Sequence, residues 1–211
     1  MTKEARRDFD KDAKSWDENP RRIRLAKAVA EAIISAASSM REMDVLDFGC
    51  GTGLVTIALQ PFVKTITGAD SSRGMLDVLE EKARSRGLGN VRTRFLDVAR
   101  RDTLEDSYDL IVSSMTLHHV PDIAGLLREW YGHLKPGGMV GLADLDREDG
   151  TFHEDNTGVF HFGFDRPMLK GILEETGFRE LTDTTVMTFR KDDGDNQGRV
   201  FSVFLITART D

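Results

Sequence analysis

Three glycines at alternate positions mark the part of this chain that is best suited to hold a ligand. They are Gly49, Gly51 and Gly53, within D-V-L-D-F-G-C-G-T-G-L at residues 44–54. The apolar run at residues 45–48 predicts a buried strand of a parallel sheet, and the apolar residues after the glycines predict a short helix. Glycine allows positive φ and close approach of a ligand, which the unpaired N–H groups of the helix start would face.

The spacing of the glycines restricts the class of ligand. A dinucleotide fingerprint is G-x-G-x-x-G or G-x-G-x-x-A, but Leu54 occupies the position of its last residue. No G-x-x-x-x-G-K-[ST] sequence occurs here, which excludes a nucleoside-triphosphate loop. Asp47 would repel a pyrophosphate and attract a cation. S-adenosylmethionine (SAM) carries a sulfonium and an ammonium and no phosphate, so it suits this turn; the alternative is a turn that binds no ligand.

A second carboxylate is expected to serve the same ligand. Asp70 lies 21 residues after Gly49, at the end of the next expected strand. An acid at about this distance accepts hydrogen bonds from ribose hydroxyls in nucleoside-binding βαβ units. The alternative is an N-cap or Asx-turn aspartate, because Ser71 and Ser72 follow and a helix begins there. The two roles are compatible.

Four of the five histidines are expected to converge on one edge of the sheet. His118 and His119 follow a predicted strand, and His153 and His161 lie on a long loop that should cover the same edge. His133, late in a helix, falls outside this set. The group has three interpretations, which are packing within the loop, a metal site, or a general base for an acidic acceptor.

The general base is the interpretation that names a chemical step, because an imidazole pKa of about 6.5 suits proton removal at neutral pH. One histidine after the strand is expected to face the pocket and the other the core. His118 is favoured as the catalytic residue, with His153 or His161 as the second candidate. No metal is expected, because no H-x-x-x-H spacing or cysteine partner accompanies these histidines.

Alternating strand and helix patterns must position these side chains. Short β-rich runs predict parallel strands at residues 45–48, 62–69, 91–95, 108–114 and 139–145. Helical spacing and terminal signals predict helices from residue 20, from residue 54, over 73–86, over 122–134 and over 165–177. Two Thr/Val/Phe-rich runs predict a terminal antiparallel hairpin at 178–190 and 199–209.

The stretch D-F-G-C-G-T-G closely resembles the glycine motif of class I SAM-dependent methyltransferases. Four further landmarks follow in the order of that family: Asp70, Asp97, L-H-H-V at residues 117–120 and P-G-G at 136–138. The resemblance implies a Rossmann-like α/β fold with helices on both faces of a mostly parallel, seven-stranded sheet. The implied strand order is 3-2-1-4-5-7-6 with the last strand antiparallel, and the implied cofactor is SAM.

The N-terminal pattern F…A…W-D resembles the UbiE type of quinone-biosynthesis enzyme within that family, whose acceptors are small molecules. Phe9, Ala13, Trp16 and Asp17 match the pattern residue by residue. The resemblance implies a lid over the SAM pocket. The alternative is a surface helix that two aromatic side chains pack in place.

The resemblance also implies roles for single residues. Met75 matches the position that packs on adenine, Asp97 the acid that bonds the adenine amino group, and Val98 the residue whose N–H reaches the ring. Without a ligand, Met75 would fill the core and Asp97 a turn. Cys50 is expected to line the pocket rather than act as a nucleophile. The expected cofactor-binding residues are Trp16, Asp47, Gly49, Cys50, Gly51, Gly53, Asp70, Ser71, Met75, Asp97, Val98 and Ser113.

Composition sets the wider bounds. The chain has 211 residues, 39% of them hydrophobic and 31% charged, with a net charge of −7, which argues against a grip on long nucleic acids. The first residues lack the apolar core of a signal peptide, and no run approaches the ~18–20 apolar residues that span a bilayer. One cysteine fits a reducing compartment. We therefore expect a cytoplasmic monomer or homodimer with no membrane partner.

A single domain is expected, with four parts. These are N-terminal helices and lid at 1–38, a SAM-binding core at 43–145, a substrate loop at 146–164, and a C-terminal helix and hairpin at 165–211. The favoured function is methyl transfer to a small-molecule acceptor. The alternatives are methylation of RNA or protein, and a SAM-binding module without catalysis. S-S-M-T at 113–116 replaces the N/D-P-P-Y/F stretch that amino-directed nucleic-acid methyltransferases carry.

Overall fold

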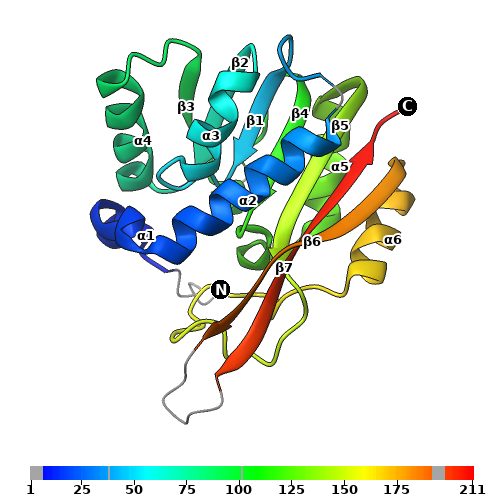
Figure 1. Ribbon diagram of the computed structural model, residues 1–211. Coiled ribbons are helices and arrows are strands. Elements are labelled where there is room, and N and C mark those ends of the chain that lie inside the picture. Colours follow the sequence, from blue (N-terminus) through cyan, green and yellow to red (C-terminus); the bar gives the residue numbers. More distant parts are fainter. Residues whose placement is uncertain (1–6, 38, 101, 192–197) are drawn as a thin grey trace.

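The computed structural model describes residues 7–37, 39–100, 102–191 and 198–211. A seven-stranded sheet runs through the molecule in the order β3-β2-β1-β4-β5-β7-β6. Strands β1 to β5 pair in parallel, and β7 runs antiparallel to both of its neighbours. The expected fold class and strand order are confirmed. Figure 1 shows the sheet with helices in front of it and behind it.

The strands are β1 (Asp44–Phe48), β2 (Thr65–Asp70), β3 (Val91–Phe95), β4 (Tyr108–Ser114), β5 (Leu134–Leu145), β6 (Arg179–Lys191) and β7 (Arg199–Arg209). The α-helices are α1 (Phe9–Asp12), α2 (Pro20–Ala36), α3 (Leu54–Leu59), α4 (Arg73–Ser85), α5 (Ile123–His133) and α6 (Arg166–Thr176). Short 3₁₀ helices are η1 (Ala13–Glu18), η2 (Gln60–Phe62), η3 (Val98–Arg100) and η4 (Leu117–His119).

Two apolar layers hold the helices against the sheet, because successive strand residues point to opposite faces. On one face, α2 and α3 pack on side chains such as Val45 and Leu110. On the other, α5 and α6 pack on their chain neighbours Leu46 and Ile111. Both faces are buried, so the central strands read as continuous apolar runs.

The order of the strands creates a switch point between β1 and β4. From β1 the chain proceeds to β2 and β3 on one side, and later to β4 and β5 on the other. Ligands of open α/β sheets bind outside the carboxyl ends of the strands at such a point. The glycine turn after β1 and the histidine pair after β4 both lie at this edge.

The structure corrects three element boundaries. The strand expected from residue 62 begins at Thr65, because Pro61 lies in the 3₁₀ helix η2. The strand expected from residue 139 begins at Leu134, and the P-G-G turn forms a bulge within it, where the register against β4 shifts. The N-terminal segment with Phe9, Ala13 and Trp16 forms α1 and the 3₁₀ helix η1 instead of one surface helix. Residues 1–6 and 38 of the expected N-terminal part lie outside the described residues.

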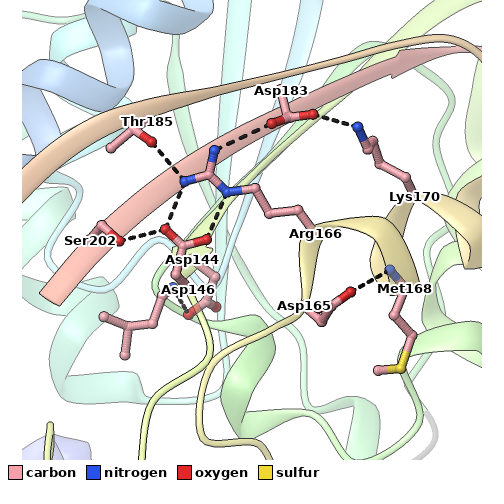
Figure 2. Close-up of polar contacts among 10 residues, drawn as sticks. Asp144, Asp146, Asp165, Arg166, Met168, Lys170, Asp183, Thr185 and Ser202 are labelled. Carbon is pink, nitrogen blue, oxygen red and sulfur yellow. Dashed lines mark hydrogen bonds and ion pairs between the residues drawn. The ribbon is translucent and has the colours of Figure 1, made fainter.

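A clamp at Arg166 ties the end of β5 to α6 and β6 (Figure 2). Two guanidinium nitrogens lie 2.7 Å from the two carboxylate oxygens of Asp146. A third contact reaches Asp183 on β6 at 3.3 Å, and Thr185 lies 2.7 Å from the same guanidinium. The Ser202 hydroxyl of β7 donates to Asp146 at 2.6 Å. The clamp therefore fixes both ends of the loop between β5 and α6.

The clamp should contribute measurably to stability. We expect Arg166→Met to lower the free energy of unfolding by about 1–3 kcal/mol, because it removes the cation that pairs with the partly buried Asp146 and leaves Asp183 paired with Lys170 alone. The matched control is Lys27→Met, which removes an exposed ion pair to Glu31 at 3.8 Å and should cost under about 0.5 kcal/mol. Urea denaturation followed by circular dichroism measures both. Equal losses in the two variants would contradict a structural role for the clamp.

Candidate functional site

The glycine turn is anchored to β2 by its own main chain. The N–H groups of Gly49 and Cys50 both donate to the Ala69 carbonyl, at 2.8 and 3.0 Å. The Gly51 N–H donates to a carboxylate oxygen of Asp70 at 2.8 Å. All three glycines have positive φ, of 69°, 54° and 80° for Gly49, Gly51 and Gly53. The alternate spacing is therefore explained by a backbone that glycine adopts at low cost.

The three glycines differ in what surrounds them. A Cβ at Gly49 would lie 2.1 Å from a Thr116 methyl group, and one at Gly53 would lie 2.3 Å from Leu79. A Cβ at Gly51 would meet only Met75 Sδ at 3.9 Å and Trp16 Nε1 at 4.0 Å. Gly49 and Gly53 therefore serve packing, whereas a Cβ at Gly51 would touch its two neighbours only at van der Waals distance, which leaves room beside its main chain.

Asp70 accepts hydrogen bonds from two backbone N–H groups, one of which forms the Asx turn that the sequence allows. One carboxylate oxygen accepts from Gly51, and the other accepts from the Ser72 N–H at 2.8 Å. Ser72 is the N-cap of α4 and accepts from the Met75 N–H at 3.1 Å. Burial raises the pKa of Asp70, and the backbone hydrogen bonds oppose that rise. These backbone bonds, to which Ser71 also contributes, leave part of the carboxylate's acceptor capacity for a further donor. Ser71 beside it is exposed.

Asp47 is a second buried carboxylate behind the turn. It accepts from the Thr56 hydroxyl at 2.6 Å and is 1% exposed. Burial raises its pKa to about 7, the Thr56 hydrogen bond opposes the rise, and the nearby charge of Asp70 adds to it. A cation bound at this edge would be attracted by both carboxylates. Cys50, also buried, has its thiol pKa raised by burial, which argues against a nucleophile.

The N-terminal segment docks on the turn through two aspartates. Asp10 accepts from the Ser72 hydroxyl at 2.5 Å and from the Gly74 N–H at 2.8 Å, at the start of α4. Asp17 accepts from the Thr52 hydroxyl at 2.6 Å and pairs with Lys82 of α4. Trp16 therefore lies beside Gly51, and the Arg22 guanidinium carbon lies over its ring, 3.6 Å from the ring centroid. This arrangement supports the proposed lid, which stays a proposal.

Three further expected residues lie along the same edge. Asp97 is buried, and its carboxylate lies 3.1 Å from Arg100 Nε. Val98 is partly buried against the α5 side of the core. Ser113 is 1% exposed, and within the described part of the chain its hydroxyl has no hydrogen-bond partner. No described contact tests the adenine-binding roles of Asp97 and Val98, so these roles remain proposals.

Three histidines gather beyond the carboxyl end of β4. His118, His119 and His153 each offer one ring nitrogen, and these nitrogens lie within 4.8 Å of one another. His118 Nδ1 lies 2.7 Å from Asp144, which is fully buried on β5. His118 Nε2 lies 3.2 Å from His153 Nε2. We call this group the histidine cluster. A contact between Phe9 and His119, with ring centroids 5.3 Å apart, connects it to the lid.

His161 lies outside the histidine cluster. Its Nε2 is 2.9 Å from the Val120 carbonyl, and its ring packs on Phe164. The N–H groups of Phe160 and His161 both reach the His118 carbonyl, at 2.9 and 3.3 Å. His161 therefore fastens the loop over η4, as the packing interpretation expects. Both members of the His118–His119 pair join the cluster. His118 is 1% exposed and His119 is only partly buried, so the histidine expected to face the pocket is the more deeply buried of the two.

The electrostatics of the cluster favour neutral rings. Burial lowers the pKa of His119 to about 4, with His118 adding to the fall. Burial lowers the pKa of His153 to about 3, and His118 and His119 add to that shift. Both rings therefore carry no charge near neutral pH, and each keeps one nitrogen lone pair.

Fold and turn together define a class I methyltransferase fold, and comparisons with known proteins agree. Residues 45–138 match the family described as "Methyltransferase domain". A SAM-dependent methyltransferase from Aquifex aeolicus superposes with a TM-score of 0.69 at 20% identity, covering 96% of this chain and 98% of that one. The structural likeness shows the fold. The resemblance to class I SAM-dependent methyltransferases is confirmed.

Two curated relatives are similar in sequence. An uncharacterized methyltransferase of Schizosaccharomyces pombe is 34% identical over 135 residues, which is 57% of this chain and 48% of the relative. The demethylmenaquinone methyltransferase of Geobacillus kaustophilus is 32% identical over 146 residues, 65% of this chain and 62% of the relative. The chain thus spans less than two thirds of the length of these relatives. Among the described residues, no helix is long and apolar enough to cross a membrane.

Sequence reasoning missed or ranked low three contributors to the site. Asp144 was read as part of an apolar strand, and only the fold places it behind His118. His119 is one of the four histidines expected at this edge, but the sequence favours His118 over it as the catalytic residue. Asp10 belongs to a polar N-terminal run, and its contact with Ser72 spans 62 residues of sequence. A buried acid in an otherwise apolar strand was the one signal that could have indicated Asp144.

Gly49 and Gly51 form a matched pair for a stability test. Gly49→Ala combines a strained positive φ with overlap on Thr116, so we expect a loss of about 2–4 kcal/mol in the free energy of unfolding. Gly51→Ala carries the φ strain alone, at about 1–2 kcal/mol. Thermal or chemical denaturation of both variants checks the difference. A Gly51→Ala loss as large as that of Gly49→Ala would show that the space at Gly51 is closed.

Asp47 should make stability depend on pH. Its pKa is about 7 in the folded state and near the ordinary 3.8 in the unfolded chain, so folding binds a proton between these values. The stabilisation is complete below pH 3.8 and is lost as pH rises through 7. We expect wild type to lose about 2 kcal/mol relative to Asp47→Asn between about pH 5 and 7.5. Denaturant titrations at several pH values measure this, and parallel profiles would refute the buried, titrating carboxylate.

Proposed function

We propose that this protein transfers a methyl group from SAM to a small-molecule acceptor in the cytoplasm. The observation that carries the proposal is the room beside the Gly51 main chain, next to Met75 and Trp16, in the turn after β1 of a class I methyltransferase fold. The methyltransferase-domain match over residues 45–138 supports the activity. A relative that acts on demethylmenaquinone supports a small acceptor.

The residues around this space fit SAM. The ligand brings a methyl group on a cationic sulfur, which is the chemistry that it supplies when bound. Asp70 would accept the ribose hydroxyls with the lone pairs that its backbone contacts leave free. Asp47 would attract the positive charge through the turn. Met75, buried at the start of α4, would pack on the adenine, and Trp16 would cover the pocket.

The histidine cluster would face the acceptor. The Trp16, Phe9 and His119 rings form a continuous series of contacts from the glycine turn to the cluster. We propose His118 as the general base, because Asp144 holds the proton on Nδ1 and leaves the lone pair on Nε2. His153 is the second candidate. The lid would exclude water, and proximity would supply much of the rate.

Two other functions compete with this proposal. Methylation of RNA or protein is disfavoured by the net charge of −7, since nucleic-acid binding usually relies on a basic face. A SAM-binding module without catalysis would keep the glycine turn but would have no need of a histidine–aspartate pair at its edge. Turnover on an acceptor panel separates the three.

The central test measures donor binding and turnover separately. S-adenosylhomocysteine should bind with micromolar affinity, about −8 kcal/mol, and raise the melting temperature. Gly51→Ala should weaken that binding at least about tenfold, because its methyl group enters the ligand space. His118→Ala should keep the affinity and lose about 10²–10⁴-fold in turnover on phenolic, quinol and thiol acceptors, followed by mass spectrometry.

His133→Ala is the control, because this histidine lies on α5 and contacts the Asp106 carbonyl, away from the cluster. It should bind and turn over like wild type. Absence of a thermal shift at millimolar S-adenosylhomocysteine would remove the basis of the proposal. Equal turnover by the His118→Ala and His133→Ala proteins would leave the donor site intact and exclude His118 as the base.

A further inference from the structure

The histidine cluster has the arrangement of a metal site as well as that of a base. Its three ring nitrogens come from two segments that the fold brings together, η4 and the loop after β5. Their mutual distances lie within 4.8 Å, and His118 Nε2 is 3.2 Å from His153 Nε2. Two metal–nitrogen bonds of about 2.0–2.1 Å at the tetrahedral angle place their nitrogens about 3.3 Å apart. The observed spacing therefore matches one edge of a tetrahedral site.

Hydrogen bonds behind the rings orient two of the three nitrogens. His118 Nδ1 is 2.7 Å from Asp144, and His119 Nδ1 is 2.7 Å from the Gly158 carbonyl. Metal-binding histidines usually donate their other N–H to a carboxylate or a backbone carbonyl in this way. Both partners here are acceptors, so Nδ1 carries the proton in each ring and Nε2 keeps its lone pair. In His118 this lone pair faces His153 Nε2 at 3.2 Å, a contact that a shared metal ion would replace.

Asp144 is itself held in place by backbone hydrogen bonds. Its carboxylate also accepts from the Leu145 N–H at 2.7 Å and from the His118 N–H at 3.3 Å. The residue is fully buried and cannot rotate into solvent. His118 is thus held rigidly, as a preorganised ligand requires.

We propose that His118, His119 and His153 bind a divalent transition metal ion of the zinc type. Three neutral imidazoles favour zinc and its neighbours over magnesium or calcium, which prefer oxygen ligands. Three protein ligands leave one tetrahedral position open, as in zinc sites that bind a water or substrate oxygen. The expectation of no metal rested on the missing H-x-x-x-H spacing, and the site needs no such spacing because His153 comes from a distant loop.

Bound metal would change how an acceptor is activated under the proposed function. A coordinated hydroxyl or thiol loses its proton more easily, because the cation stabilises the anion. His118 Nε2 would then hold the metal instead of receiving the proton. Metal binding itself is independent of methyl transfer, so it can be tested without donor or acceptor.

The experiment titrates Zn²⁺ into the full chain after treatment with a chelator, using a chromophoric chelator as competitor. We expect one equivalent bound per chain with micromolar or tighter affinity, and a higher melting temperature. Co²⁺ in place of Zn²⁺ should give the intense visible absorption of a four-coordinate ion. His153→Ala should weaken binding at least about tenfold while S-adenosylhomocysteine binding, measured separately, confirms that the protein is folded.

Two variants serve as controls. His161→Ala and His133→Ala remove histidines outside the cluster and should still bind one equivalent of Zn²⁺.

Asp144→Asn weakens the orienting contact and should lower the Zn²⁺ affinity by about 10–100-fold and shift the Co²⁺ spectrum. His153→Ala should lack the intense visible absorption of four-coordinate Co²⁺ at every pH between about 6 and 8.

The proposal is overturned if wild type binds Zn²⁺ no more tightly than His153→Ala. The contact between His118 and His153 would then be an N–H···N hydrogen bond, with His118 as base. Metal binding without S-adenosylhomocysteine binding would support the metal site and contradict the proposed function. Binding of S-adenosylhomocysteine without metal binding would contradict the metal site and leave the proposed function standing.

Discussion

The hydrogen bond from the Gly51 N–H to Asp70 is the contact on which the rest of the candidate site depends. It joins the turn after β1 to the end of β2, and Ala69 reinforces the junction by accepting from two further amides. Because Asp70 also holds the Ser72 N–H, the start of α4 is fixed in the same step. Asp10 then docks the N-terminal segment on Ser72, so lid, turn and helix share one support.

The glycine turn could be predicted from the sequence because its constraint is local. A backbone that needs positive φ at alternate residues restricts those positions to glycine, and the flanking strand and helix show in the hydropathy pattern. Asp70 could be predicted for a related reason, since its distance from the turn is set by one helix and one strand. The Asx turn that it forms with the Ser72 N–H was among the expected alternatives, whereas its bond from the Gly51 N–H is found only in the structure. Gly49 packs tightly against Thr116, whereas Gly51 lies beside Trp16 with more room. No local sequence pattern reveals this difference.

The histidine cluster could be predicted only in part. On an extended chain, neighbouring side chains point to opposite sides, so one histidine of the pair was expected to face the core. Leu117–His119 instead forms a 3₁₀ turn, with about 120° between successive residues, and both rings reach the same cluster. His153 arrives through a loop whose ends depend on the Arg166 clamp and on the pairing of Asp146 with Phe164. These contacts join residues far apart in the sequence, so residue spacing could not predict them.

Carboxylates at the strand ends lie behind both the glycine turn and the histidine cluster. Asp47, Asp70 and Asp144 are carboxylates on β1, β2 and β5, near the edge where the glycine turn and the histidine cluster lie. Burial raises the pKa of both Asp47 and Asp70, which shows that their charges are costly without a cation nearby. A cationic ligand lowers these pKa values when it binds, so ligand binding and proton release are linked. Asp144 differs because a histidine already faces it, so a cationic ligand at the glycine turn would act on the protonation of Asp47 and Asp70 alone.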